Sequence, residues 1–207
     1  MQSWRRLPAD WQPAPSLPVV PVATPAPPSD PDHYNLLARC SGELVHAGLR
    51  ALVERGSDWL TPTVELPLWR SQLRPLCADA SALAKACSHV RRQLQCCLED
   101  AGTGWLFQSP QREDHCEWAL IDWREGPRRD HVIDRTFIAA DGERWIIDYK
   151  SAAPASGQPL ADFVAEQEAK YRAQLLRYRA LFEHEGRRIR CALLFTPLPL
   201  LHELALP

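Results

Sequence analysis

A β-hairpin is predicted by the segment His131-Val-Ile-Asp-Arg-Thr-Phe-Ile-Ala-Ala-Asp-Gly-Glu-Arg-Trp-Ile-Ile-Asp-Tyr-Lys150. Aromatic and β-branched residues flank the turn signal Asp141-Gly142, as is typical of two antiparallel strands joined by a tight loop. On the second strand Asp148 and Lys150 are two residues apart, so both side chains project from the same face.

The length of the turn decides which residues of the two strands face each other. A three-residue loop at 140–142, with Gly142 in the left-handed conformation, pairs Asp134 with Asp148. A two-residue loop would instead pair Asp134 with Tyr149. Only the first register, or a bulge with the same effect, brings the two carboxylates together.

Two neighbouring carboxylates repel each other unless a cation neutralises them, and Mg²⁺ binds one or two carboxylates while it keeps several waters. Lys150 could hold an attacking water and stabilise charge on a phosphate. An Asp-x-Lys tripeptide often occurs by chance as a surface ion pair. Here the apolar run 145–147 leads directly into Asp148, which favours a functional site.

The remaining chain predicts a mixed α/β domain whose central sheet is mostly antiparallel. Hydrophobic spacing predicts helices, while short aromatic and β-branched runs predict strands. The expected helices span 33–55, 79–99 and 160–185, the expected strands span 105–108, 116–123, 131–139, 144–149 and 189–195, and 64–76 stays ambiguous.

Residues 1–32 are rich in proline without hydrophobic periodicity, which predicts an extended linker or tether. Such a tether suggests that the domain hangs from something larger. The folded domain is expected over 33–207, with a helical part at 33–103 and a catalytic core at 104–207.

Composition sets broad limits on the function. The formal net charge is −2 and the pI about 6.4, which does not favour DNA binding in bulk, although a local basic strip could still bind it. The 7 cysteines include no CxxC pair, and with no secretory signal they indicate a reducing cytoplasm. We expect no transmembrane span.

The predicted helix at 160–185 carries a polar and aromatic stripe formed by Gln167, Tyr171, Gln174 and Tyr178. One interpretation is an amphipathic helix whose tyrosines pack at the rim of the core. The other is a face that contacts a DNA backbone and supports a metal site.

Taken together and in this order, several motifs resemble the RecB-family nucleases of the PD-(D/E)xK superfamily. The similarity is strongest to the C-terminal nuclease domain of RecB- and AddA-type helicase–nucleases. The motifs are the G-x-x-x-H element ending in His46, the acidic strand with Glu117, Asp134, Asp148-Tyr149-Lys150, and the QxxxY pattern of Gln174 and Tyr178. The resemblance implies a restriction-endonuclease-like core with a helical N-terminal addition.

It also implies an exonuclease-like, Mg²⁺-dependent deoxyribonuclease in which Mn²⁺ can replace Mg²⁺. The implied metal ligands are His46, Asp134, Asp148 and the backbone carbonyl of Tyr149. The implied catalytic residues are Lys150, Asp148, Asp134 and Glu117. Glu113 or Asp114 could serve in place of Glu117. The residues expected to position DNA are Gln174, Tyr178, Tyr171 and Arg135.

The cluster-binding cysteines of some relatives are absent, so no iron–sulfur cluster is expected. The sequence contains no P-loop motif. The chain is therefore expected to act alone or with a helicase subunit or domain of a RecBCD/AddAB-type complex in recombinational DNA repair. Two alternatives stay open: a non-catalytic DNA-binding or docking module, and a nuclease that acts on RNA.

Overall fold

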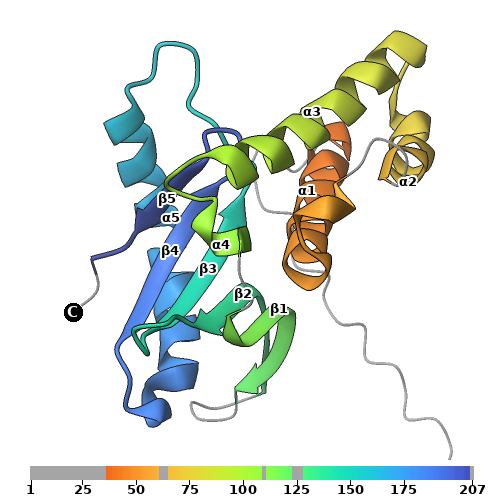
Figure 1. Ribbon diagram of the computed structural model, residues 1–207. Coiled ribbons are helices and arrows are strands. Elements are labelled where there is room, and N and C mark those ends of the chain that lie inside the picture. The colour runs from red at the N-terminus through yellow and green to blue at the C-terminus, as the bar shows by residue number, and fades with distance from the viewer. Residues whose placement is uncertain (1–35, 61–64, 109–110, 123–127, 206–207) are drawn as a thin grey trace, which may run out of the picture.

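A computed structural model describes residues 36–60, 65–108, 111–122 and 128–205 (Figure 1). The proline-rich segment 1–32 lies outside this part. The helices are α1 (Leu36–Arg55), α2 (Glu65–Leu73), α3 (Ala80–Glu99), α4 (Trp105–Gln108) and α5 (Leu160–Phe182), with short 3₁₀ turns η2 (Ser57–Trp59), η3 (Arg74–Leu76) and η4 (Glu183–Glu185). The strands are β1 (Arg112–Asp122), β2 (Arg129–Ile138), β3 (Arg144–Lys150), β4 (Ile189–Phe195) and β5 (Leu200–Glu203).

The strands form one mixed sheet in the order β1-β2-β3-β4-β5. Neighbouring strands are antiparallel except β3 and β4, which are parallel and are connected through α5. A helical crossover is the usual connection between parallel neighbours. The predicted α/β class with a mostly antiparallel sheet is therefore confirmed.

Helices cover the sheet on both faces, and β3 shows this most clearly. Its residues are buried on both sides, apart from Lys150 at its end. Trp145, Ile147 and Tyr149 pack into the core formed with α1 and α3, whereas Ile146 packs into the core formed with α5. Figure 1 shows α1 and α3 side by side on one side of the sheet, with α5 passing behind it. Polar residues at the end of β3 therefore lie between two helical layers.

The helical part is held together by close approach of α1 and α3. A Cβ at Gly48 of α1 would lie 2.5 Å from Leu94 Cδ1 of α3, so only glycine fits without displacing that side chain. At the start of α3, Asp79 accepts a hydrogen bond from the backbone N–H of Ala82 at 2.7 Å. Side-chain caps of this type stabilise a helix by about 1 kcal/mol.

Two elements differ from the sequence predictions. The run 105–108 forms α4 rather than a strand, because Leu106 and Phe107 are buried beside the helical core and the Trp105 indole donates to the Gly102 carbonyl at 3.0 Å. A short apolar run cannot be assigned from periodicity alone. Strand β5 was not predicted, since prolines surround it. Among the described helices, none is both long and apolar enough to cross a membrane.

Candidate metal and catalytic site

The turn between β2 and β3 has the three-residue form that the sequence analysis required. Gly142 has φ +86°, and the Ala139 N–H donates to the Glu143 carbonyl at 2.9 Å. The ladder pairs Arg135 with Ile147, so one further step places Asp134 across from Asp148. The predicted register is confirmed.

Strand β1 extends the acidic row to a third strand. The neighbouring pairs of β1 and β2 leave Glu117 opposite Asp134. Glu117 has φ +49°, in the left-handed region that residues other than glycine rarely adopt. Backbone strain of this kind costs roughly 1–3 kcal/mol, and Glu113 on the same strand shares it with φ +47°. Glu117, Asp134 and Asp148 thus lie at one level of three adjacent strands.

The structure also separates Glu117 from its two acidic neighbours. Glu113 forms an ion pair with Arg144 at 2.6 Å, and Asp114 forms one with Arg135 at 2.8 Å. Both carboxylates are occupied by arginines of β2 and β3. Glu117 is therefore the better candidate for the acidic residue of β1.

Helix α1 brings His46 to the acidic row. Gly42 lies at the point of approach, where a Cβ would be 3.1 Å from Ser151 Oγ just beyond the end of β3, so that the serine side chain would shift by only a few tenths of an ångström. His46 Nδ1 then lies 3.6 Å from Asp134 Oδ1 and 3.9 Å from Glu117 Oε1. One ligand atom from each of these three residues lies within 4.8 Å of the other two. In the described part of the chain, His46, Glu117 and Asp134 form the group that could hold a metal ion; we call it the His–Glu–Asp cluster.

Tyr149 adjoins this cluster without offering its phenol to it. Its ring packs edge-on against His46, with centroids 5.5 Å apart, and is buried. The backbone N–H of Tyr149 donates to Asp134 Oδ2 at 2.6 Å and fixes that carboxylate. His46 also forms a hydrogen bond with the Tyr149 backbone. This bond raises the pKa of His46, but burial and the charge of Lys150 lower that pKa more strongly. The Tyr149 backbone is thus beside the cluster, as its implied role requires.

Asp148 lies outside the His–Glu–Asp cluster and is held by other side chains. Lys150 Nζ is 2.6 Å from Asp148 Oδ2, and Gln174 Nε2 donates to Asp148 Oδ1 at 3.2 Å. Only 3% of Asp148 is exposed. The expected set therefore divides: His46 and Asp134 come together with Glu117, while Asp148 is joined to the catalytic candidate Lys150.

Burial dominates the electrostatics of the site. It raises the pKa of Asp134 to about 7, and repulsion from Asp148 acts in the same direction. Burial also raises the pKa of Asp148 and of Glu117. It lowers the pKa of His46 to about 4, assisted by the charge of Lys150. A neutral imidazole beside buried carboxylates that resist ionisation is an arrangement that a bound cation would stabilise.

Helix α5 supports Asp148 through its polar stripe. Gln174 also donates to the Tyr178 hydroxyl at 2.8 Å, and that hydroxyl donates to the Val132 carbonyl of β2 at 2.9 Å. Tyr178 is buried, whereas Leu176 on another side of the helix is exposed. The stripe therefore faces the sheet. Gln174 and Tyr178 brace the acidic site, and Tyr171 lies under Lys150 with its ring centroid 3.9 Å from Nζ.

Arg135 does not occupy the position expected of a DNA-binding residue. Only 1% of it is exposed, and its guanidinium donates to Asp114 and to the Leu106 carbonyl in the interior. Its ring neighbours are Phe107 and Phe137. The expectation of a DNA contact was wrong, because position 135 points into the core shared with the helical part.

Sequence reasoning overlooked the strain at Glu117 and the position of Lys170. A left-handed residue within a strand has no signature in the sequence when it is not glycine. Lys170 lies beside Tyr171, with Nζ 5.3 Å from that ring centroid, and the QxxxY motif does not include it. Only the packing of α5 shows that this lysine adjoins the site. No known family model matches the chain, and no curated protein matches it.

Proposed function

We propose that this chain is a metal-dependent nuclease that hydrolyses phosphodiester bonds of DNA, with a restriction-endonuclease-like core of the PD-(D/E)xK kind. One observation carries the proposal. An imidazole and two carboxylates from α1, β1 and β2 converge, and a carboxylate and lysine pair lies at the end of the adjacent strand β3.

The donor set suits a divalent cation. Carboxylate oxygens are preferred by Mg²⁺ and Mn²⁺, and the neutral imidazole adds a nitrogen donor of the kind that transition-metal ions accept. His46, Glu117 and Asp134 would hold the ion, with Asp148 and the Tyr149 carbonyl as further donors. A bound ion would supply Lewis acidity and a water of lowered pKa.

The lysine and the residues around it define the remaining chemistry. Lys150 could orient the attacking water and stabilise negative charge that develops on the phosphate. Asp148 holds the ammonium group in place, and Gln174 holds Asp148 from the other side. This chain of contacts fixes the lysine on a rigid strand, as pre-organised catalysis requires.

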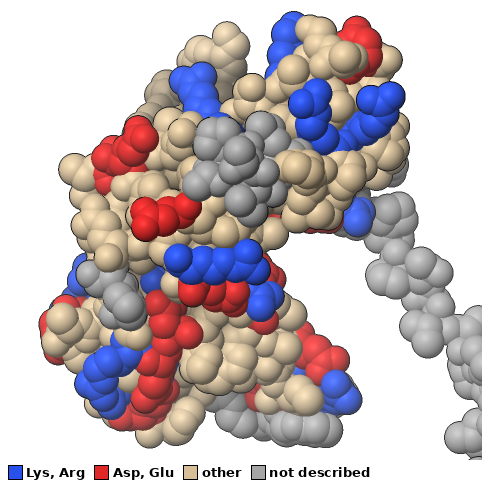
Figure 2. All heavy atoms as spheres, turned by 45° about the vertical axis from the view of Figure 1, so that its right-hand side comes forward, with Lys and Arg blue, Asp and Glu red and all other residues tan. Residues whose placement is uncertain are grey.

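Binding of DNA must rest on local charge rather than on net charge. Figure 2 shows basic and acidic side chains next to one another near the centre of one face, and several basic side chains together at its upper right. Lys150 and Lys170 therefore contribute most where they lie, next to the acidic site. We further propose that the domain works with a helicase subunit or domain in DNA repair, with 1–32 as its tether.

Cleavage of linear DNA tests the proposal. With Mg²⁺ or Mn²⁺ the protein should degrade single- or double-stranded substrates, and Lys150→Met should abolish this. Lys85→Met, at an exposed position of α3, is the matched control and should cleave normally. Absence of cleavage by the unaltered protein, or equal cleavage by Lys150→Met, would refute the nuclease. DNA binding without cleavage would instead support a non-catalytic docking module.

A further inference from the structure

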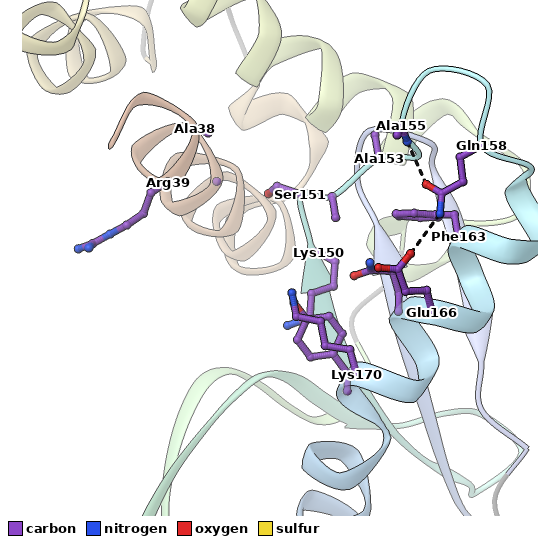
Figure 3. Close-up of a pocket in the computed structure, with 14 residues that line it drawn as sticks. Ala38, Arg39, Lys150, Ser151, Ala153, Ala155, Gln158, Phe163, Glu166 and Lys170 are labelled. Carbon is purple, nitrogen blue, oxygen red and sulfur yellow. Dashed lines mark hydrogen bonds between the residues drawn. The ribbon is translucent and has the colours of Figure 1, made fainter. Parts of the chain in front are cut away.

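One flank of the Lys150 side chain is open space. The residue lines a pocket of about 580 Å³ between α1 and α5, and Figure 3 shows its side chain extending from the end of β3 toward Lys170. Asp148 and Tyr171 contact its ammonium group. Because a lysine side chain is long and flexible, these contacts keep their geometry only if the backbone of Lys150 is fixed.

Thr196 holds that backbone from β4. It is the residue that follows β4, it is fully buried, and its N–H donates to the Lys150 carbonyl at 3.0 Å. This bond lies one step beyond the last pair of the β3–β4 ladder, which joins Lys150 to Phe195. Since the end of a ladder opens more readily than its middle, the position of Lys150 depends on how firmly Thr196 is held.

Helix α3 holds Thr196 through Gln93. The Thr196 hydroxyl donates to Gln93 Oε1 at 2.5 Å, although the two residues are 103 positions apart in the sequence. Gln93 Nε2 lies 2.8 Å from His89 Nε2, and because an amide nitrogen only donates, this contact fixes which way the amide points. The Cys97 thiol donates to the Thr196 carbonyl at 3.7 Å. Thr196 is therefore held by two side chains of α3.

Packing alone does not account for the contact between Gln93 and Thr196. It lies where α3 meets the sheet, and the neighbouring residues Val90, Leu94 and Cys97 are buried and apolar. A buried hydrogen bond adds little net stability, because it replaces hydrogen bonds to water, and an apolar pair of the same shape packs about as well. A hydrogen bond has a preferred direction, which an apolar contact lacks. The contact therefore serves orientation more than stability.

From this chain of contacts, and resting on the proposed nuclease function, we propose that Gln93 and Thr196 are positioning residues for the catalytic lysine. They hold the Lys150 carbonyl, and through it the ammonium group, where that group acts on the attacking water or the phosphate. Helix α3 supplies no member of the His–Glu–Asp cluster, yet it acts on catalysis by this route. A displacement of about 1 Å can lower a catalytic rate about 100-fold, so a small movement at Thr196 is enough.

Replacement of Thr196 in the full chain tests the proposal. Thr196→Val keeps the shape and removes the hydroxyl, whereas Thr196→Ser keeps the hydroxyl. With Mg²⁺ and linear DNA, Thr196→Val and Gln93→Leu should lower kcat about tenfold at nearly unchanged KM and Mn²⁺ affinity, and Thr196→Ser should retain most of the activity. The matched control is Thr136→Val, which removes a buried hydroxyl that donates to the Trp145 carbonyl at 2.8 Å, at the opposite end of β3. It should lower the melting temperature similarly and leave kcat unchanged.

Two further measurements separate positioning from a structural role. In the Lys150→Met background, Thr196→Val should lower the residual cleavage no further, because the two residues act as a unit. The chain has three lysines, so NMR of protein labelled at lysine Cε can resolve Lys150, whose signal Lys150→Met assigns. Thr196→Val should shift this signal, and Thr136→Val should leave it in place.

Normal kcat in a folded Thr196→Val, an equal loss of activity in both backgrounds, or an unchanged Lys150 signal would overturn the positioning inference. Cleavage by the unaltered protein would leave the nuclease proposal standing in that case. If the unaltered protein neither binds Mn²⁺ nor cleaves DNA, the nuclease proposal fails. A Lys150 signal that Thr196→Val shifts would then still show that Thr196 positions the lysine.

Discussion

Replacement of Asp134 by asparagine should stabilise the metal-free protein at pH 8 and abolish its stabilisation by Mn²⁺. The reason is the raised pKa of this carboxyl, which lies near 7 in the fold against an ordinary value of 3.8. The folded state therefore binds the proton more tightly than the unfolded chain does. The stability associated with the protonated form is complete below pH 3.8, falls as the pH rises, and is lost above about pH 7.

The magnitude follows from the size of the shift. One pKa unit corresponds to about 1.4 kcal/mol, so ionisation of Asp134 opposes folding at pH 8 by on the order of 4 kcal/mol. Asparagine stays neutral and can still accept the hydrogen bond from the Tyr149 N–H. Because part of this cost comes from repulsion between Asp134 and Asp148, we expect Asp134→Asn to recover about half of it, about 2 kcal/mol of folding stability. For a chain of this size the melting temperature should rise by about 4–8 °C at pH 8, and by less at pH 5.

Thermal melts followed by circular dichroism, at both pH values and in EDTA or Mn²⁺, would measure this. Mn²⁺ at about one hundred times its dissociation constant should stabilise the unaltered protein by about 2.7 kcal/mol and Asp134→Asn by much less. Asp58→Asn, at an exposed position of η2, is the control and should change neither quantity. A destabilised Asp134→Asn at pH 8 that still responds fully to Mn²⁺ would show that Asp134 neither opposes folding nor binds the ion.

The other predictions concern separate parts of the site. Lys150→Met should lower the rate of DNA cleavage at least about 100-fold, while calorimetry should show that Mn²⁺ still binds. Loss of both cleavage and Mn²⁺ binding would contradict the proposal that Lys150 acts on the attacking water or the phosphate. Gly42→Leu should push α1 from the end of β3, displace His46 and weaken Mn²⁺ binding about tenfold, whereas Gly42→Ala should have little effect in the same titration. Arg135→Met should destabilise the fold by about 3–5 kcal/mol in urea with unchanged DNA affinity of the folded protein; weaker DNA binding would restore its expected role. The apparent Mn²⁺ affinity should rise between pH 5 and 7 and level off above pH 7, because Asp134 must lose its proton to bind the ion while His46 is already neutral. Calorimetry across this pH range would measure the affinity. An affinity that does not change with pH would show that Asp134 is not a ligand.

The hairpin could be predicted because its information is local. Gly142 fixes the turn, and period-two alternation fixes which side chains share a face. Together they determine that Asp134 lies across from Asp148, and the structure confirms this register. The α/β class was equally accessible, since the chain shows helical patterns, then a run of short strand patterns, and then a further helix and strand.

What could not be predicted depends on contacts between distant segments. The left-handed backbone of Glu117 cannot be read from its residue type, because glutamate rarely adopts this conformation. The direction of the α5 stripe was undetermined, because a helix with amides and phenols on one face can turn that face to solvent or to a polar site. Arg135 shows the same limit: its charge suggested a surface position, but Asp114 on β1 provides a buried partner.

The site is built from three layers, and this has a consequence for how binding and folding are related. His46 comes from α1, Glu117 and Asp134 come from the sheet, and Gln174, one of the two side chains that hold Asp148, comes from α5. No single segment supplies more than one member of the His–Glu–Asp cluster, so the unfolded chain offers no comparable set of ligands. A cation that binds this cluster must therefore stabilise the whole domain, and the close approach of α1 at Gly42 becomes part of metal affinity. The same carboxylates that weaken the metal-free fold are then the ones that strengthen it once the charge is neutralised.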